Sequence, residues 1–293
     1  MRKLLATIAG LVCCLLLTAA SLAHGPAALS KKATQLSPER CEDVETVDQC
    51  HMNYPTGCGI PKNATNANYT PRYDAYLNYL KNQTPKSTIQ PVKILTRADF
   101  TGLEDKMPAD LKKGHNGEHA AELAALGQGQ ILGLVGYLYI VQVTGKESTN
   151  CELSGADDQG RDKTDYHIHV GFDETAARRL RDGWKPTKDE TLGLQQTSVI
   201  VEMTPHYRQW HQPTWTAERL QPHLGRQVRV IGQLLADNEH ADASANCAHP
   251  NADKNKCWRA SIWELHPVIE FYICSEVTCA PNSPNWKKVK DLP

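Results

Sequence analysis

The stretch ILGLVGYLYIVQVT, residues 131–144, decides the fold of this chain. It is apolar and rich in β-branched and aromatic residues, which favour a pleated strand. Gly133 and Gly136 interrupt it, and glycine inside a strand marks a sharp bend or the close approach of another backbone. We therefore expect one long strand that bends, as strands do at the corner of a small barrel.

Four more strand patterns and one helix pattern follow this stretch. The strands are expected at Tyr166–Phe172, Ser198–Met203, Gln227–Leu235 and Ser261–Ile273. The helix is expected at Thr216–Leu224, and Gly225 ends it. Three strands, one helix and two strands is the order of the OB fold, a small Greek-key barrel. The sequence therefore predicts a mainly β protein with a five-stranded OB-like β-β-β-α-β-β barrel domain at 130–274 and a C-terminal tail at 275–293.

The chain begins with the residue order of a signal peptide. Two basic residues come first, an apolar run extends from Leu4 to Ala20, and Ser-Leu-Ala precedes His24. The run is short for a membrane span and a small-residue cleavage site follows it. We expect residues 1–23 to be removed and the mature protein to be secreted or periplasmic, with no membrane attachment.

Two further segments precede the barrel. Residues 24–40 lack periodicity and are rich in Ala, Ser, Lys and Pro, so we expect a flexible leader. Residues 41–129 contain three cysteines and helical patterns from Pro71 to Thr84 and from Glu118 to Leu126. They predict a small, cysteine-tied, partly helical N-terminal region.

Eight cysteines lie beyond the signal peptide, an even number in a chain expected to be exported. Disulfides are therefore the default interpretation. No C-x-x-C pair occurs, which weakens the alternative of a cysteine-based zinc site. We expect the local pairs Cys247–Cys257 and Cys274–Cys279, with the other bonds formed among Cys41, Cys50, Cys58 and Cys151.

Net charge and motifs exclude some classes of function. Without Arg2 and Lys3, the chain has 30 basic residues of its 32 against 33 acidic ones, a net charge of −3. Nucleic acid is therefore not favoured as a partner, because its binding relies on concentrated basic surfaces. Short basic runs at 178–181 and 287–290 are expected to be a solvated helix face and tail. No phosphate-binding glycine loop or nucleophile elbow occurs, which argues against nucleotide-binding enzymes and serine hydrolases.

Histidines and carboxylates gather on one face of the expected strands. Alternation places Asp165, His167 and His169 together on the second strand, and Glu264 with His266 on the last. That face is expected to point inward. Such a group is either a divalent metal or acid–base site, with His167, His240 and His266 as candidate metal ligands, or a buried polar network without a ligand. The candidate polar cluster consists of His167, Glu202, Asp237, His240, Glu264 and His266.

Aromatic residues lie in or beside the expected strands. One interpretation is a platform on which bases or sugars stack, and the other is ordinary packing of the core and the barrel rim. The residues concerned are Tyr137, Tyr139, Tyr166, Trp210, Trp215, Trp258 and Trp263.

Several motifs together resemble a family of uncharacterised bacterial secreted proteins. They are ESTNC at 147–151, DYHIHV at 165–170, VIVEMTP at 199–205, VRVIGQLLAD at 228–237 followed by Glu239-His240, and WELHPV at 263–268. The usual form of the last motif has isoleucine where this chain has Leu265. The resemblance covers roughly residues 72–274. It implies an OB-type barrel and export, and it implies no particular reaction.

Together these observations predict an exported OB-like binding module whose ligand is unknown and is an oligosaccharide, a peptide or a nucleic acid. The alternative is a metal-dependent hydrolase, such as a phosphodiesterase or nuclease, that uses the histidines and carboxylates. A third interpretation is an interaction protein of the bacterial envelope without a small ligand.

Overall fold

The structure is a computed structural model that describes residues 44–50, 74–85 and 92–292. The expected signal peptide and leader, and with them Cys41 and Cys58, lie outside the described residues.

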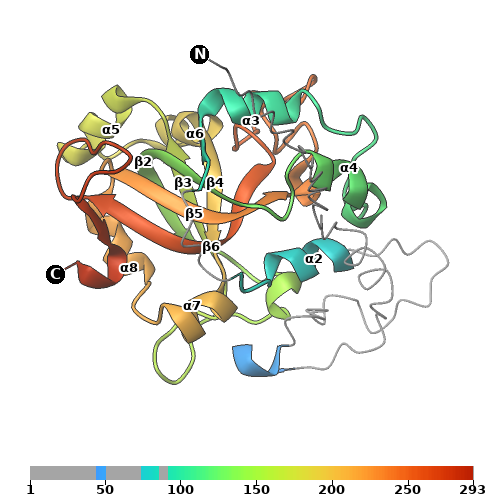
Figure 1. The fold of residues 1–293 in the computed structure, drawn as a ribbon, viewed down its shortest axis with the longest axis horizontal. Coiled ribbons are helices and arrows are strands. Elements are labelled where there is room, and N and C mark those ends of the chain that lie inside the picture. Colours follow the sequence, from blue (N-terminus) through green and yellow to red (C-terminus); the bar gives the residue numbers. More distant parts are fainter. Residues whose placement is uncertain (1–43, 51–73, 86–91, 293) are drawn as a thin grey trace, which may run out of the picture.

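Five strands close into a barrel (Figure 1). β2 (Ile131–Val143) pairs antiparallel with both β3 (Tyr166–Gly171) and β5 (Gln227–Ala236). β4 (Ser198–Met203) joins β3 to β6 (Trp263–Cys274), and β6 pairs with β5 to complete the circle. The predicted OB-like barrel is confirmed, and each strand lies within a few residues of its expected position.

Gly136 shows why the long strand β2 needs glycine. A Cβ at this position would lie 2.6 Å from the carbonyl oxygen of Gly171 on β3. No side chain fits there without moving the neighbouring backbone, so the close approach predicted from the sequence is present.

Two short strands extend the barrel sheet. β1 (Ile94–Leu95) lies parallel to β2, and β7 (Trp286–Lys288) pairs antiparallel with β6. The segment expected to be a tail therefore contains a strand, followed by the 3₁₀ turn η7 (Val289–Asp291).

The predicted helix between the third and fourth barrel strands is present in two pieces, α8 (Ala217–Leu220) and the 3₁₀ turn η5 (Gln221–His223). Gly225 follows with φ +76°, the left-handed conformation that favours glycine. A further helix, α7 (Pro205–His211), precedes them and was not expected from the sequence. Proline in its first turn and the cap at Thr204 explain where it begins.

Two helices lie between β3 and β4, where the sequence predicted only a basic helix face at 178–181. α5 (Glu174–Arg181) is capped by Asp173, and α6 (Lys188–Gln196) begins with a capping box formed by Thr187 and Glu190. The basic run predicted to be a solvated helix face lies on α5, where Arg178 and Arg179 are exposed.

Short helical elements of the N-terminal region pack beside the barrel. They are η2 (Val47–Gln49), α2 (Ala75–Lys81), α3 (Arg97–Glu104), η3 (Asn116–His119) and α4 (Ala120–Ala125). Figure 1 shows α2 and α4 on one side of the barrel, away from α5 and α8. The side chain of Asp74 caps α2 and also accepts the backbone N–H of Asn116, so α2 is fixed to the segment before α4.

Three disulfides are present among the described residues. Cys247–Cys257 and Cys274–Cys279 confirm the two local pairs, and Cys50–Cys151 joins two members of the remaining set. Disulfides of this number indicate an oxidising environment. Within the described ranges, no helix is both long and apolar enough to span a lipid bilayer.

Candidate functional site

The site lies on one face of the β3–β4–β6 part of the barrel. Ile168, Val201 and Leu265 are aligned across these strands and belong to the main hydrophobic core. Because side chains alternate along a strand, their neighbours lie on the opposite face. His167 and Glu202 are directly opposite each other there, in the β3–β4 register.

This face is buried by loops, which corrects the expectation that it points into the barrel. Glu264 and His266 are fully buried, as predicted, but they flank Leu265, whose side chain belongs to the core. Asp165, from the chain between β2 and β3, lies against His266, and Arg259, from the chain between β5 and β6, pairs with Glu264. Lys81, at the end of α2, pairs with the neighbouring Asp237. The polar side chains thus lie in a layer between the barrel wall and its covering loops.

Glu202 is the centre of the cluster. Its Oε1 lies 3.0 Å from His167 Nε2, and its Oε2 lies 3.1 Å from His266 Nδ1. Burial lowers the pKa of each ring, but the Glu202 charge outweighs it and raises the pKa of His167 to about 9 and that of His266 to about 10. Burial would raise the pKa of Glu202, yet the two histidines hold it well below its usual range.

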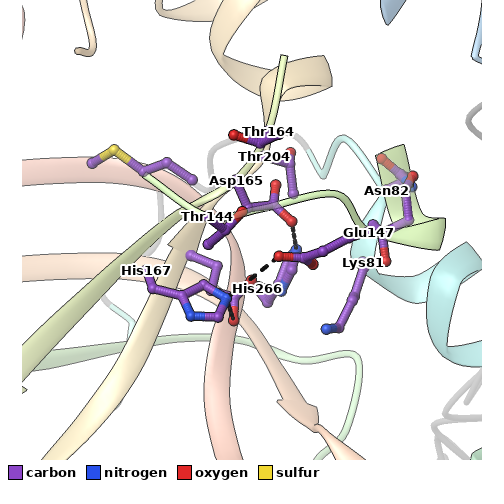
Figure 2. Close-up of polar contacts among 12 residues, drawn as sticks. Lys81, Asn82, Thr144, Glu147, Thr164, Asp165, His167, Thr204 and His266 are labelled. Atoms are coloured by element: carbon purple, nitrogen blue, oxygen red, sulfur yellow. Dashed lines mark hydrogen bonds and ion pairs between the residues drawn. The ribbon is translucent and has the colours of Figure 1, made fainter. Parts of the chain in front are cut away.

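Asp165 lies directly before β3, and its carboxylate points toward His266 (Figure 2). Its Oδ2 is 3.9 Å from His266 Nε2, and neither oxygen has a hydrogen-bond partner among the described residues. Burial, followed by the negative charge of Glu147, raises the pKa of Asp165 to about 7.

Arg259 and Asp237 form a second row behind Glu202. The Arg259 guanidinium donates hydrogen bonds to Glu264 Oε2 and to Asp237 Oδ2, the latter at 3.1 Å. Asp237 also lies 3.4 Å from Lys81 Nζ, at the end of α2. Burial alone would raise the pKa of Asp237, but these cations and His240 hold it well below its ordinary value.

Asp237 fixes the ring of His240, which is partly exposed to solvent. It lies in the 3₁₀ turn η6 (Asn238–His240) just after β5, and Asp237 Oδ2 is 2.8 Å from its Nδ1. Its side chain is 31% exposed, whereas those of Asp237 and Arg259 are completely buried. The second ring nitrogen, Nε2, is therefore the one free to meet a ligand.

Glu147 approaches from the other side of the cluster, and α2 positions it. Glu147 precedes the 3₁₀ turn η4 (Ser148–Asn150). The Asn78 side chain donates to Ser148 Oγ and accepts from the Thr149 hydroxyl, and Asn82 donates to the Thr149 carbonyl. Glu147 Oε1 consequently lies 3.8 Å from His167 Nε2 (Figure 2).

Two hollows meet over the exposed edge of the cluster. The larger, of about 590 Å³, is lined by Lys146, Gln195 and Trp258. The smaller, of about 230 Å³, is lined by Lys81, Lys113 and Ser148 among others. Both share Glu147, His167 and His240, so these three side chains form the wall between the two halves of one groove.

Trp258 belongs to this groove, whereas most of the other aromatic residues singled out pack in the interior. Its ring lies 6.2 Å from that of His167, nearly parallel, and 5.0 Å from that of His240, nearly perpendicular. Tyr139, Tyr166, Trp215 and Trp263 are buried, and Trp210 is exposed and donates a hydrogen bond to Asp48. Core packing therefore accounts for most of the set.

Three groups of side chains among the described residues bring potential metal-ligand atoms within 4.8 Å of one another. They are Glu147 with His167 and Glu202, Asp165 with Glu202 and His266, and Glu202 with Asp237 and Glu264. Imidazole and carboxylate ligands suit first-row divalent metals, so these residues fit such an ion. His240, the third candidate ligand, belongs to none of these groups.

The structure brings the six predicted cluster residues together in one connected network. The predicted cluster lacked four charged members, Lys81, Glu147, Arg259 and Asp165, although strand alternation had placed Asp165 on the same face as His167. The motifs around Glu147 and Asp165 gave a signal for those two, since both lie in the stretches ESTNC and DYHIHV. No sequence motif pointed to Lys81, because it lies on a helix that joins the site only through tertiary packing.

His169 shares the face of His167 but does not join the cluster. Its Nδ1 lies 2.9 Å from Ser198 Oγ, and burial, followed by the charge of His167, lowers its pKa to about 3. A neutral imidazole in this place packs against the edge of the Trp258 ring.

Comparison with known proteins identifies no family for this chain, since no family model, no curated protein and no solved structure matches it.

Proposed function

We propose that this protein is a divalent-metal-dependent hydrolase whose metal is held by Glu147, His167 and Glu202. The observation that carries the proposal is the convergence of these three ligand atoms beside the groove, with separations of 3.0 and 3.8 Å from His167 Nε2. In a tetrahedral zinc site with ligands 2.0–2.1 Å from the ion, neighbouring ligand atoms are roughly 3.3 Å apart. Glu147 and His167 line the groove and Glu202 is buried, so three protein ligands leave one position on the groove side for water, as catalytic zinc sites do.

Charge balance supports a metal in the cluster. Five carboxylates gather there, those of Glu147, Asp165, Glu202, Asp237 and Glu264, and the fixed cations are Lys81 and Arg259. Three negative charges remain when the imidazoles are neutral. In the metal-free protein, protons on His167 and His266 offset two of them, and a divalent ion that takes the place of these protons supplies the same two charges. A divalent ion supplies two positive charges at the point where the carboxylates are densest.

The same residues suggest how hydrolysis would proceed. A divalent ion lowers the pKa of a bound water to about 7 and thereby supplies hydroxide at neutral pH. His240, oriented by Asp237, is placed in the groove to donate a proton through Nε2 to the leaving group. This pairing of a histidine with a buried carboxylate fixes both the ring orientation and its tautomer.

We assign a phosphodiester as the substrate class, because lysines line both halves of the groove. Lys146 lies in the larger half, and Lys81 and Lys113 line the smaller one. In the proposed reaction, hydroxide would add to phosphorus, the P–O bond to one alcohol would break, and that alkoxide would take a proton from His240. The products are a phosphomonoester and an alcohol, so one water is consumed for each bond broken.

The test is hydrolysis of bis(p-nitrophenyl) phosphate by protein loaded with Zn²⁺ or Mn²⁺. Activity should vanish on treatment with a chelator and return with metal. His240→Ala should lower kcat by about 10²- to 10⁴-fold while the metal content stays unchanged, as expected for loss of a general acid. His223→Ala, on η5 and outside the groove, is the matched control and should retain full activity. Metal-free protein with the same activity would contradict the proposal.

A binding module remains the second candidate, and Trp258 favours it. An aromatic ring beside a hollow of about 590 Å³ is suited to stacking against a sugar ring or another planar group. In this case a soluble oligosaccharide would quench Trp258 fluorescence with equal affinity in the presence and absence of chelator. We further propose export to the periplasm or the cell exterior, which the three disulfides support.

A further inference from the structure

We propose a second divalent-metal site, formed by Asp165 and His266, that shares Glu202 with the first site and makes the centre dinuclear. The inference rests on the proposed function, which requires only the first metal. It assigns a role to the buried half of the cluster, which a mononuclear site leaves unused.

Glu202 belongs to both groups of potential ligands, the one with Glu147 and His167 and the one with Asp165 and His266, as a bridging carboxylate would. One of its oxygens lies 3.0 Å from His167 Nε2, and the other lies 3.1 Å from His266 Nδ1. Each group places its ligand atoms within 4.8 Å of one another. A carboxylate that offers one oxygen to each of two ions holds them at the separation of about 3.5–4 Å typical of two-metal hydrolases.

Asp165 provides an independent indication of a ligand. It is completely buried, and its two oxygens have no hydrogen-bond donor among the described residues. Figure 2 shows the carboxylate aimed toward His266, with Thr144, Thr164 and Thr204 around it. A buried carboxyl group without a partner is costly, and a cation between Asp165 and His266 would satisfy it.

His266 is held in the orientation of a metal ligand. Its Nδ1 lies 3.1 Å from Glu264 Oε1, and Arg259 in turn holds the other oxygen of Glu264. Its Nε2 is buried without a hydrogen-bond partner and lies on the side of Asp165. A histidine that donates one N–H to a fixed carboxylate and offers its other nitrogen to a metal is the usual arrangement in metalloenzymes.

Two ions also balance the charge of the cluster. Three negative charges remain after Lys81 and Arg259 are counted against the five carboxylates, with His167 and His266 neutral as metal ligands must be. One divalent ion leaves a single negative charge, whereas two divalent ions with one shared hydroxide leave none. The shared hydroxide would be the nucleophile that adds to phosphorus, with the P–O bond and the leaving-group proton as described for the single-metal reaction.

The test counts the metal ions that the protein binds. Protein stripped with chelator and dialysed against Mn²⁺ should bind two ions per chain, and the pair should give an exchange-coupled electron paramagnetic resonance signal. Asp165→Asn, which keeps the size of the side chain, should bind one ion and lose the coupled signal. Glu147→Gln should likewise bind one, and His223→Ala should bind two.

The outcomes separate the two proposals. Wild type with one ion per chain and an uncoupled signal would overturn the dinuclear site and leave the mononuclear hydrolase standing. Wild type with no bound ion would overturn both. Two ions in Asp165→Asn would show that the second ion binds elsewhere, which also contradicts the assignment. Because the count and the coupled signal are measured on wild type, the test does not depend on the folding of any variant.

Discussion

Glu202 contacts His167 through one carboxylate oxygen and His266 through the other, at 3.0 and 3.1 Å. The three residues come from three different barrel strands, and all project from the face opposite the core. Any change at Glu202 therefore affects both histidines at once. This carboxylate is the point through which the buried and exposed halves of the cluster are joined.

Glu202→Gln should strongly destabilise the metal-free protein. The change leaves two buried imidazolium groups without their shared counter-charge, and breaking a buried ion pair typically costs about 3–5 kcal/mol. Chemical denaturation of chelator-treated protein measures the effect. The control is Glu218→Gln on the exposed side of α8, which should change the free energy of unfolding by less than about 0.5 kcal/mol. Equal stabilities for the two variants would mean that Glu202 has no electrostatic role.

Lys81→Met should have opposite effects on stability and on metal affinity. The ammonium is buried against Asp237, so its loss removes an ion-pair partner and should lower the stability of the metal-free protein by about 3 kcal/mol or more. It also removes a positive charge from the cluster, so the affinity for a divalent ion should rise. Calorimetric titration with Zn²⁺ beside thermal melts checks both. Weaker metal binding in this variant would count against a cation site near Lys81.

Removing the Cys50–Cys151 disulfide should cost more than removing Cys274–Cys279. The first bond links residues 101 positions apart and holds the end of η4, whereas the second closes a loop only 5 positions long. Loop-closure entropy gives about 4–5 kcal/mol for a loop near 100 residues and less for a short one. Paired cysteine-to-serine variants and thermal melts provide the comparison. The reverse order would show that entropy of the unfolded chain is not the main contribution here.

Asp242 should make the loop after His240 sensitive to acid. Hydrogen bonds from the Ser244 hydroxyl and from the backbone N–H groups of Ser244 and Ala245 hold the pKa of Asp242 below its usual value. A lowered folded-state pKa contributes stability that is present above the ordinary value of 3.8 and is lost as the pH falls through the folded-state value. The hydrogen-exchange protection factors of residues 238–246, which correct for the slower intrinsic exchange in acid, should therefore fall in this acidic range, and Asp242→Asn should remove the pH dependence.

The barrel was predictable from the sequence because its signals are local. The glycines of β2 and the stop at Gly225 mark a bend and a helix end wherever the rest of the chain lies. The helices α6 and α7 were missed, and α5 was predicted only as a basic helix face at 178–181, since each is about two turns long and depends on its N-terminal cap. Caps at Asp173, Thr187 and Thr204 were visible in the sequence and would have identified them.

The site was predictable where strand alternation decided it and not where loops did. Alternation correctly grouped His167, Glu202, Glu264 and His266, because pairing of the strands brings their faces together. The direction of that face was mistaken for the inside of the barrel, since an apolar pattern shows that a strand is buried and not by what. Lys81 belongs to the cluster because it lies at the end of α2, and the position of this helix depends on contacts between distant segments, which no local pattern encodes.

X-ray absorption spectroscopy of zinc-loaded protein tests the central claim most directly. The account predicts nitrogen and oxygen ligands at about 2.0–2.2 Å from the ion, with the outer-shell scattering of an imidazole ring that disappears when His167 and His266 are both replaced by alanine. Zinc surrounded by water oxygens alone, with a spectrum that the two substitutions leave unchanged, would contradict a metal centre built on Glu202.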